Sequence, residues 1–370
     1  MKFFFSFFGL FLAFIFLASC GDNNSAPTGQ NQAPAAGSQS KSSAQPSAAS
    51  PAKPQEAAPP ADLAEDEVWE NGKKYFVLKL PVSVDAPSPE IFLSAEENGF
   101  FEQSGLKTNY VGSVPGNQTL PSILKGIIHT NGRGHVNTTI AAISAGAKIK
   151  AVAQKTESTK KQPHMVAIVK KDSPINTAQD LVGKKIGSPG SSGCNGYFHL
   201  AYLRQAGIPD VKNAADLVVI KEAVIEQALR QGDIDVALTH KLPDYYATND
   251  EFRVIFSDYD IWENRGGGTP YFFSLDFIKN RPDVVRAFAT AMAKTANWAN
   301  EHPLENREIT ARRFKMDINV VTERYYAPNA IIQPDTVTVW LELLEEFKEI
   351  QPGLPLDKIF TNEFNPFYKS

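Results

Sequence analysis

Residues 166–208 read VAIVKKDSPINTAQDLVGKKIGSPGSSGCNGYFHLAYLRQAGI, and this stretch decides the fold. Two short segments, 165–169 and 184–187, are predicted as strands because they are bounded by turn residues and hold the apolar side chains of a buried strand. Small residues then lead into a helical pattern that starts near Cys194 and ends at Gly207. This order of strand, loop and helix predicts an α/β sheet.

The chain before this stretch repeats the same order. Residues 74–84 alternate between apolar and polar side chains, as a strand with one buried face does. A loop with two prolines follows at 85–89, and then come an apolar helical segment at 91–101 and a strand at 106–111. Another strand is predicted at 149–154.

The chain after this stretch continues as α/β and then becomes helical. Strands are predicted at 218–220 and 234–238, and the helix between them ends at Gly232. Apolar side chains at helical spacing predict long helices through 284–296 and 340–347.

The first residues have the pattern of an export signal. Lys2 is followed by an apolar run at 3–17, which is short for a membrane span and has the length of a secretory h-region. The run ends in Leu-Ala-Ser-Cys with Cys20 last, which resembles a bacterial lipobox. We therefore expect residues 1–20 to be a lipoprotein signal peptide and Cys20 to be acylated. An ordinary signal peptide with a coincidental cysteine is the alternative.

Composition limits the class of the remaining chain. Residues 21–70 are mostly Ala, Ser, Pro, Gln, Asn and Gly, which predicts a disordered tether. The roughly 300 residues beyond it suffice for two domains. A net charge of -4 gives no reason to expect a nucleic-acid partner. The second of the two cysteines, Cys194, has no partner for a disulfide once Cys20 is acylated.

Four segments carry a resemblance to a known family. They lie at 92–110, 166–208, 231–237 and 277–303, and they include the motifs ENGFFE, DLVGKKI and GDID. Together they resemble the nitrate, sulfonate and taurine type of ABC-transporter substrate-binding protein. The chain departs from that pattern at 126–134, where such proteins often carry a second Gly-Asp-x-Asp.

The resemblance implies a fold, a function and partners. It implies the type II periplasmic-binding-protein fold, an α/β fold with two lobes joined by two crossovers. Lobe one would hold 75–166 and 265–370, and lobe two would hold 167–264. It also implies a monomer without a cofactor that captures a small solute outside the inner membrane. The closed form would then dock on an ABC permease, while the lipid anchor holds the protein to the periplasmic face of the membrane or to the cell surface.

The loop before the helix at Cys194 is the strongest candidate for solute binding. In open α/β sheets, ligands bind beyond the carboxyl ends of strands. Small residues leave backbone N–H groups accessible at the helix start, which favours an anion. A plain helix cap is the alternative interpretation. The candidates in this loop are Ser191, Ser192, Gly193, Cys194 and Asn195.

Three further loops supply candidates. Asp85 and Ser88 follow the first strand, where a rigid turn explains them equally well. His240 and Lys241 follow the strand at 234–238 and would favour a negatively charged solute, unless they are merely solvated. The third loop contains Asn137, Thr138 and Thr139, which precede a predicted helix. These residues would either cap that helix or donate to an anion. Apart from these three loops, the glycines at 266–268 suit a hinge in the return crossover or a mobile surface loop.

The main hypothesis is therefore a binding protein for a sulfonate, nitrate or carboxylate. A neutral or cationic heterocycle such as a thiamine-precursor pyrimidine is the nearest alternative, with Asp244, Tyr245 and Tyr246 as its candidates. A surface-tethered enzyme that uses Cys194 as its nucleophile is the alternative of another class. A sensor subunit for a membrane receptor is a further possibility. The histidines show no H-x-x-x-H or H-E-x-x-H spacing, so no metal site is predicted.

Overall fold

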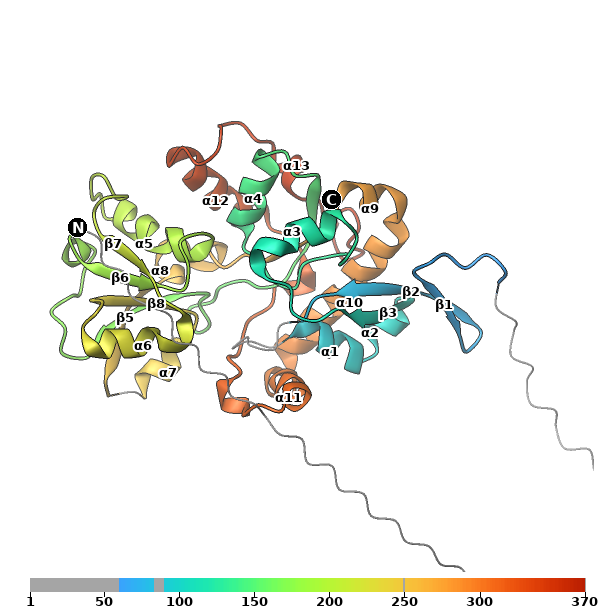
Figure 1. Ribbon diagram of the computed structural model, residues 1–370, viewed down its shortest axis with the longest axis horizontal. Helices are drawn as coiled ribbons and strands as arrows, with labels where there is room; N and C mark the ends of the chain where they lie inside the picture. Colours follow the sequence, from blue (N-terminus) through green and yellow to red (C-terminus); the bar gives the residue numbers. More distant parts are fainter. Residues whose placement is uncertain (1–59, 83–89, 249, 370) are drawn as a thin grey trace, which may run out of the picture. The chain divides into compact units, whose positions relative to one another are not determined.

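The computed structural model describes residues 60–82, 90–248 and 250–369. Two α/β lobes, each built around its own sheets, make up this part of the chain (Figure 1). No helix in these ranges combines the length and the apolar character needed to span a bilayer. The predicted signal peptide, Cys20, Asp85 and Ser88 lie outside the described residues.

Lobe two is defined by a five-stranded sheet in the order β7-β6-β8-β5-β9. Strand β6 pairs in parallel with β7 and β8, whereas β5 pairs antiparallel with β8 and β9. Its strands are β5 (Val166–Lys170), β6 (Lys185–Ser188), β7 (Asp216–Val219), β8 (Val236–Thr239) and β9 (Phe252–Ser257). Its helices are α5 (Cys194–Gln205), α6 (Glu222–Gln231), α7 (Pro243–Ala247) and α8 (Asp258–Trp262), and η1 (Gln179–Leu181) is a 3₁₀ turn.

Lobe one holds the other two sheets and most of the helices. Strand β2 lies between β1 and β3, and β4 pairs antiparallel with β10. The strands are β1 (Glu67–Glu70), β2 (Lys73–Leu80), β3 (Leu106–Tyr110), β4 (Ile149–Gln154) and β10 (Pro270–Ser274). The helices are α1 (Ile91–Glu97), α2 (Phe100–Gln103), α3 (Gly116–Leu124), α4 (Val136–Ser144), α9 (Leu275–Asn280), α10 (Pro282–Glu301), α11 (Pro303–Phe314), α12 (Pro334–Glu346) and α13 (Leu356–Ile359), with 3₁₀ turns η2 (Glu263–Arg265), η3 (Ile318–Val320) and η4 (Pro328–Ala330).

Two crossovers join the lobes, as the resemblance implies. The chain leaves lobe one after β4 and returns to it through 263–269 into β10. The two crossovers touch, since Thr156 Oγ1 lies 2.6 Å from Thr269 Oγ1 and 3.0 Å from the Gly267 carbonyl oxygen. A Cβ on Gly267 would lie 2.1 Å from Ser158 Oγ, so only glycine allows this close approach.

The apolar pattern of the sequence explains the core of lobe one. Phe76, Leu78 and Leu80 alternate along β2 and are all buried, as predicted for a strand with one buried face. Helix α10 begins with Pro282 at its first position and buries the face that contains Phe288. Burying each such large apolar side chain contributes roughly 1.5–3 kcal/mol.

The structure corrects the prediction at several places. The tether was predicted to extend to residue 70, but Glu67–Glu70 form β1 and pair with β2. Strand β1 therefore lies within the range predicted as tether. Strands β9 and β10 were not predicted. Strand β10 is nearly all buried and so lacks the alternation that marks a strand with one exposed face.

Candidate functional site

Two helix starts face each other between the lobes. Helix α4 of lobe one and helix α5 of lobe two both begin without a side-chain cap. A Cβ on Gly193, the N-cap of α5, would lie 3.5 Å from Thr138 Cγ2 in the first turn of α4. The first N–H of α4, that of Val136, donates to the Gly268 carbonyl oxygen at 3.1 Å. Because the other N–H groups of a first helical turn lack helical partners and a helix start carries a partial positive charge, this arrangement suits an anion.

The loop before α5 is held tightly over the helix. Gly193 has a φ of 65°, and a Cβ on Gly196 would lie 2.3 Å from the Ser191 carbonyl oxygen. Ser188 Oγ donates to the Asn195 carbonyl oxygen at 2.8 Å. Glycines at these positions therefore let the loop approach the first turn of α5, as the sequence pattern suggests.

Three histidines and the cysteine gather at the same place. We call this set, His135, His164, Cys194 and His240, the His–Cys cluster. Cys194 Sγ lies 3.3 Å from His164 Nε2 and 3.7 Å from His240 Nε2. The ring centroid of His164 lies 5.1 Å from those of both His135 and His240. The cluster joins the N-cap of α4, the outgoing crossover, the start of α5 and the end of β8.

A carboxylate holds His240 in place. Glu222, at the start of α6, accepts from the His240 backbone N–H at 2.6 Å and lies 3.0 Å from its Nδ1. Burial alone would lower the pKa of His240, but hydrogen bonds with Cys194 and Glu222 outweigh it and raise this pKa to about 10. Burial would raise the pKa of Glu222, yet the contacts with His240 lower it to about 2. His240 and Glu222 therefore form an ion pair.

The other two histidines of the cluster are neutral. Burial lowers the pKa of His135 to about 4 and that of His164 well below its ordinary value. His135 Nε2 lies 3.2 Å from the Gly266 carbonyl oxygen, and its Nδ1 lies 3.1 Å from Asn137 Oδ1. These contacts fix the orientation of the His135 ring.

A buried network supports His164. Ser158 donates to Asp258 Oδ2, and the other oxygen of Asp258 accepts from Met165 N at 3.1 Å. The His164 backbone N–H donates to Ser158 Oγ at 3.2 Å. Burial raises the pKa of Asp258 to about 6 in spite of these hydrogen bonds. The crossover that carries His164 is therefore fixed to α8 of lobe two.

The cluster borders a narrow gap that has no room for a water molecule. Trp340 of α12 forms part of its wall, contacts the His135 ring edge-on and donates to the Gly266 carbonyl oxygen at 2.9 Å. Residues of both lobes therefore meet at this gap. The lining residues are His135, His164, Met165, Cys194, Phe198, Asp258, Trp262, Gly266 and Trp340.

A half-buried cation bridges the lobes beside the cluster. Arg324 of lobe one donates to the His240 carbonyl oxygen at 2.6 Å and to the Pro163 carbonyl oxygen at 3.3 Å. Burial lowers the pKa of Arg324, and nearby acidic groups oppose this effect. Its positive charge adds to that of the helix starts.

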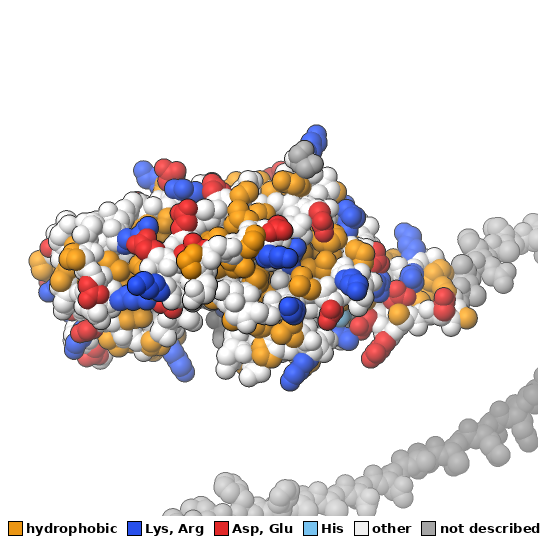
Figure 2. All heavy atoms as spheres, turned by 90° about the horizontal axis from the view of Figure 1, so that it is seen from above, with side chains coloured by type: hydrophobic (Ala, Val, Ile, Leu, Met, Phe, Trp, Pro, Cys, Tyr) orange, Lys and Arg blue, Asp and Glu red, His pale blue; other side chains and the backbone are white. Residues whose placement is uncertain are grey.

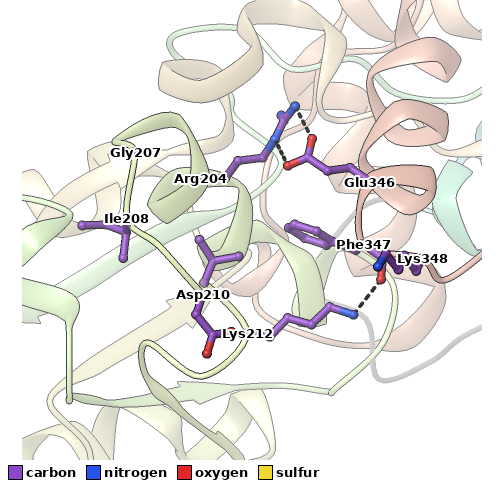
Figure 3. A pocket seen from close by; sticks show the side chains of 9 residues that line it. Arg204, Gly207, Ile208, Asp210, Lys212, Glu346, Phe347 and Lys348 are labelled. Atoms are coloured by element: carbon purple, nitrogen blue, oxygen red, sulfur yellow. Dashed lines mark hydrogen bonds and ion pairs between the residues drawn. The ribbon is translucent and has the colours of Figure 1, made fainter.

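A second contact between the lobes lies farther out along α5. We call it the rim, and its residues are Arg204, Lys212, Glu346, Phe347 and Glu349. Arg204 Nε donates to Glu346 at 2.7 Å, and Lys212 Nζ donates to the Phe347 carbonyl oxygen at 2.8 Å (Figure 3). Lys212 Nζ also donates to Glu349 at 2.6 Å. Tyr197 stacks on Phe347 with ring centroids 6.3 Å apart.

The sequence-predicted candidates fall into two groups. Cys194 and His240 lie in the His–Cys cluster, and Thr138 lies beside Gly193. Other candidates lie near the two helix starts. Asn137 and Thr139 are buried there, whereas Ser191 and Ser192 are exposed. Asn195 also lies there, and its Oδ1 is buried without a hydrogen-bond partner. Lys241 lies apart, because its ammonium pairs with Glu226 at 2.8 Å and lies over the Tyr245 ring.

Several residues of this region were missed by reasoning from sequence. Glu222, Arg324 and Trp340 are widely separated along the chain. Glu222 contacts the His240 ring, Arg324 contacts the His240 carbonyl oxygen and Trp340 contacts the His135 ring. His135 and His164 failed the test for local metal-binding spacing because each contributes from a different segment. No local pattern marks such a set.

Comparisons with known proteins agree with this geometry. A family model described as "NMT1/THI5 like" matches residues 87–306 of the 370. No curated protein sequence matches the chain significantly.

Solved structures share the fold at low sequence identity. The periplasmic aliphatic sulphonate binding protein SsuA from Escherichia coli is 17% identical, with a TM-score of 0.60 over 76% of this chain and 91% of that one. The periplasmic nitrate-binding protein NrtA from Synechocystis PCC 6803 is 12% identical, with a TM-score of 0.61 over 78% and 86%. The desulfurization enzyme DszB is 17% identical, with a TM-score of 0.52 over 77% and 97%. This is the type II periplasmic-binding-protein fold.

Proposed function

The chain belongs to the NMT1/THI5-like family, and from this premise we propose that it is the substrate-binding component of an ABC importer for a small anion. The solute would be a sulfonate, nitrate or carboxylate. The observation that carries this proposal is the pair of uncapped helix starts, α4 and α5, which meet between the lobes.

The electrostatics of the gap favour an anion. A negative group near one helix start gains roughly 0.3–1 kcal/mol at a surface and up to about 2 kcal/mol in partly buried geometry. Here two helix starts and the guanidinium of Arg324 face the same region. In the open form the solute would meet one lobe, and closure would follow because the closed form binds it more tightly.

The fold neighbours support this solute class. SsuA and NrtA are described as sulphonate-binding and nitrate-binding proteins. The pyrimidine alternative has less support, because its candidates on α7 lie outside the His–Cys cluster. Asp244 and Tyr245 are exposed, and the hydroxyl of the buried Tyr246 donates to Glu226 at 2.8 Å.

We also propose a cellular location for the protein. Acylated Cys20 would anchor a monomer to the membrane outside the cytoplasm, and the residues between Cys20 and β1 would act as a tether. The closed protein would deliver its solute to a permease. Figure 2 shows acidic and basic side chains interspersed over the face it draws, so among the described residues this face offers no broad basic area to a nucleic acid.

A thermal-shift screen tests the solute class. The panel contains alkanesulfonates, nitrate, small carboxylates and pyrimidines, each with a chelator present. A ligand at 100 times its Kd stabilises the folded state by about 2.7 kcal/mol, so a cognate anion should raise the Tm clearly. A panel in which pyrimidines raise the Tm and every anion fails contradicts the proposal.

A second candidate function rests on a specific arrangement of three side chains. Cys194, His240 and Glu222 follow one another at 3.7 Å and 3.0 Å, which is the order of nucleophile, base and orienting carboxylate in cysteine enzymes. The fold also occurs in the enzyme DszB. Cys194→Ser separates the two functions: a tethered enzyme would lose turnover, whereas a binding protein would keep its solute affinity.

A further inference from the structure

Three metal-ligating side chains converge between the lobes. One ligand atom each from His135, His164 and Cys194 lies within 4.8 Å of the other two. All three side chains line the narrow gap between the lobes. This set combines two imidazoles and one thiol, which are the donors that thiophilic divalent ions prefer.

The spacing of these atoms is close to what a metal ion requires. With Zn–N near 2.0–2.1 Å and Zn–S near 2.3 Å, ligand atoms around a tetrahedral ion lie about 3.3–3.6 Å apart. Cys194 Sγ and His164 Nε2 already lie 3.3 Å apart. A movement of about 1 Å would bring the widest pair into range, and a side-chain rotation is enough for that.

Neighbouring groups already orient the ligands. His135 Nε2 lies 3.2 Å from the Gly266 carbonyl oxygen, which is the outer contact that a ligating histidine commonly makes. An ion bound to Nδ1 would displace the contact with Asn137. His240, held by Glu222, lies 3.7 Å from the sulfur and would hydrogen-bond to the bound thiolate.

We infer that His135, His164 and Cys194 form a binding site for a thiophilic divalent ion of the Zn²⁺ class. Three protein ligands leave one coordination position open, as in zinc sites that bind an exchangeable ligand. An ion with a single thiolate keeps a net positive charge, which an anionic oxygen at the open position would offset. The site draws ligands from both lobes and the crossover, so the bound ion also favours the closed form.

Cobalt provides the direct test, because a Co²⁺–thiolate bond gives a charge-transfer absorption band that histidine ligands alone do not give. The full chain carrying Cys20→Ser is titrated with Co²⁺ and then with Zn²⁺, so that Cys194 is its single thiol. We expect one equivalent of Co²⁺ to produce the band and Zn²⁺ to abolish it. Cys194→Ser should remove the band.

Substitutions of a supporting residue and of a ligand should weaken Zn²⁺ binding to different extents. Glu222→Gln should weaken Zn²⁺ binding roughly 10–100-fold, which is the usual cost of losing an outer partner, and His164→Ala should weaken it more. His302→Gln lies outside the cluster and should bind Zn²⁺ normally. Circular dichroism checks that each variant folds. On the chain without substitutions in the cluster, bound Zn²⁺ should protect Cys194 from alkylation by iodoacetamide.

Two results would overturn the inference: a cobalt spectrum without the thiolate band, or alkylation of Cys194 at the same rate with and without Zn²⁺. The inference stands apart from the proposed importer function, since solute binding is screened with a chelator present. A chain that binds Zn²⁺ but no anion, or an anion but no Zn²⁺, would tell the two proposals apart.

Discussion

The lobes of this protein meet at two contacts that differ in kind. In the His–Cys cluster His135 and Cys194 are buried and His164 and His240 are half-buried, and its polar groups are bonded to one another, to Glu222 or to backbone atoms. The rim consists of ion pairs between half-exposed side chains, such as Arg204 and Glu346 at 44% and 45% exposure. Surface ion pairs contribute about 0–1 kcal/mol, whereas leaving a buried polar group without its partner costs about 1–3 kcal/mol. We therefore expect the centre to contribute more than the rim to closure and to solute binding.

The largest effect is expected from filling the space at the start of α5. Gly196→Ala places a methyl group 2.3 Å from the Ser191 carbonyl oxygen, so the loop must move. We expect a loss of about 1–3 kcal/mol in stability and a loss of solute affinity of more than tenfold. Isothermal titration calorimetry measures the affinity. Gly116→Ala, at the start of α3 with open space around its Cβ, is the matched control and should change neither quantity.

His199 of α5 lies on the helix that joins the two contacts. Burial lowers its pKa to about 4, so its contribution to stability is present above pH 6.5 and is lost as the pH falls through 4. A shift of this size corresponds to about 3 kcal/mol. We expect His199→Leu to flatten the loss of stability between pH 6.5 and 4 in urea denaturation. Parallel curves for the variant and the parent would show that this histidine is not protonated on unfolding.

Glu222→Gln tests the ion pair at the centre. The pKa of His240 should fall from about 10 toward its ordinary value, which NMR titration measures. Because a raised histidine pKa stabilises the fold below pH 6.5 and loses this effect as the pH rises through 10, the variant should be least stable relative to the parent near pH 4.5–6.5. The lowered pKa of Glu222 keeps its own contribution in place down to about pH 2. We expect a cost of about 1.5–3 kcal/mol, and a cost that is independent of pH would contradict the ion pair.

The smallest effect is expected at the rim. A double-mutant cycle with Arg204→Ala and Glu346→Ala should give a coupling energy of about 0–1 kcal/mol that decreases with added salt. Solute affinity should stay within a fewfold of the parent. A coupling well above this range would reverse the ranking of the two contacts.

Much of the fold follows from local pattern, whereas most of the site does not. The alternation of apolar and polar residues predicted β2, and apolar residues at helical spacing followed by a glycine predicted α6. These predictions succeed because the signals come from residues that are neighbours in the sequence. The glycine-rich loop before α5 made Cys194 a candidate. His240 was a candidate because it follows directly after β8. The partners of these residues, Glu222, His135 and His164, lie in separate segments of the chain that only the folded structure brings together. No spacing rule along the chain describes a contact that tertiary structure creates.

The position of a bound solute tests the central claim most directly. A crystal structure with the tightest anion from the screen should show its charged group within hydrogen-bond distance of the first backbone N–H groups of both α4 and α5. A solute bound at the rim, or bound to one lobe with the two helix starts empty, would contradict the account.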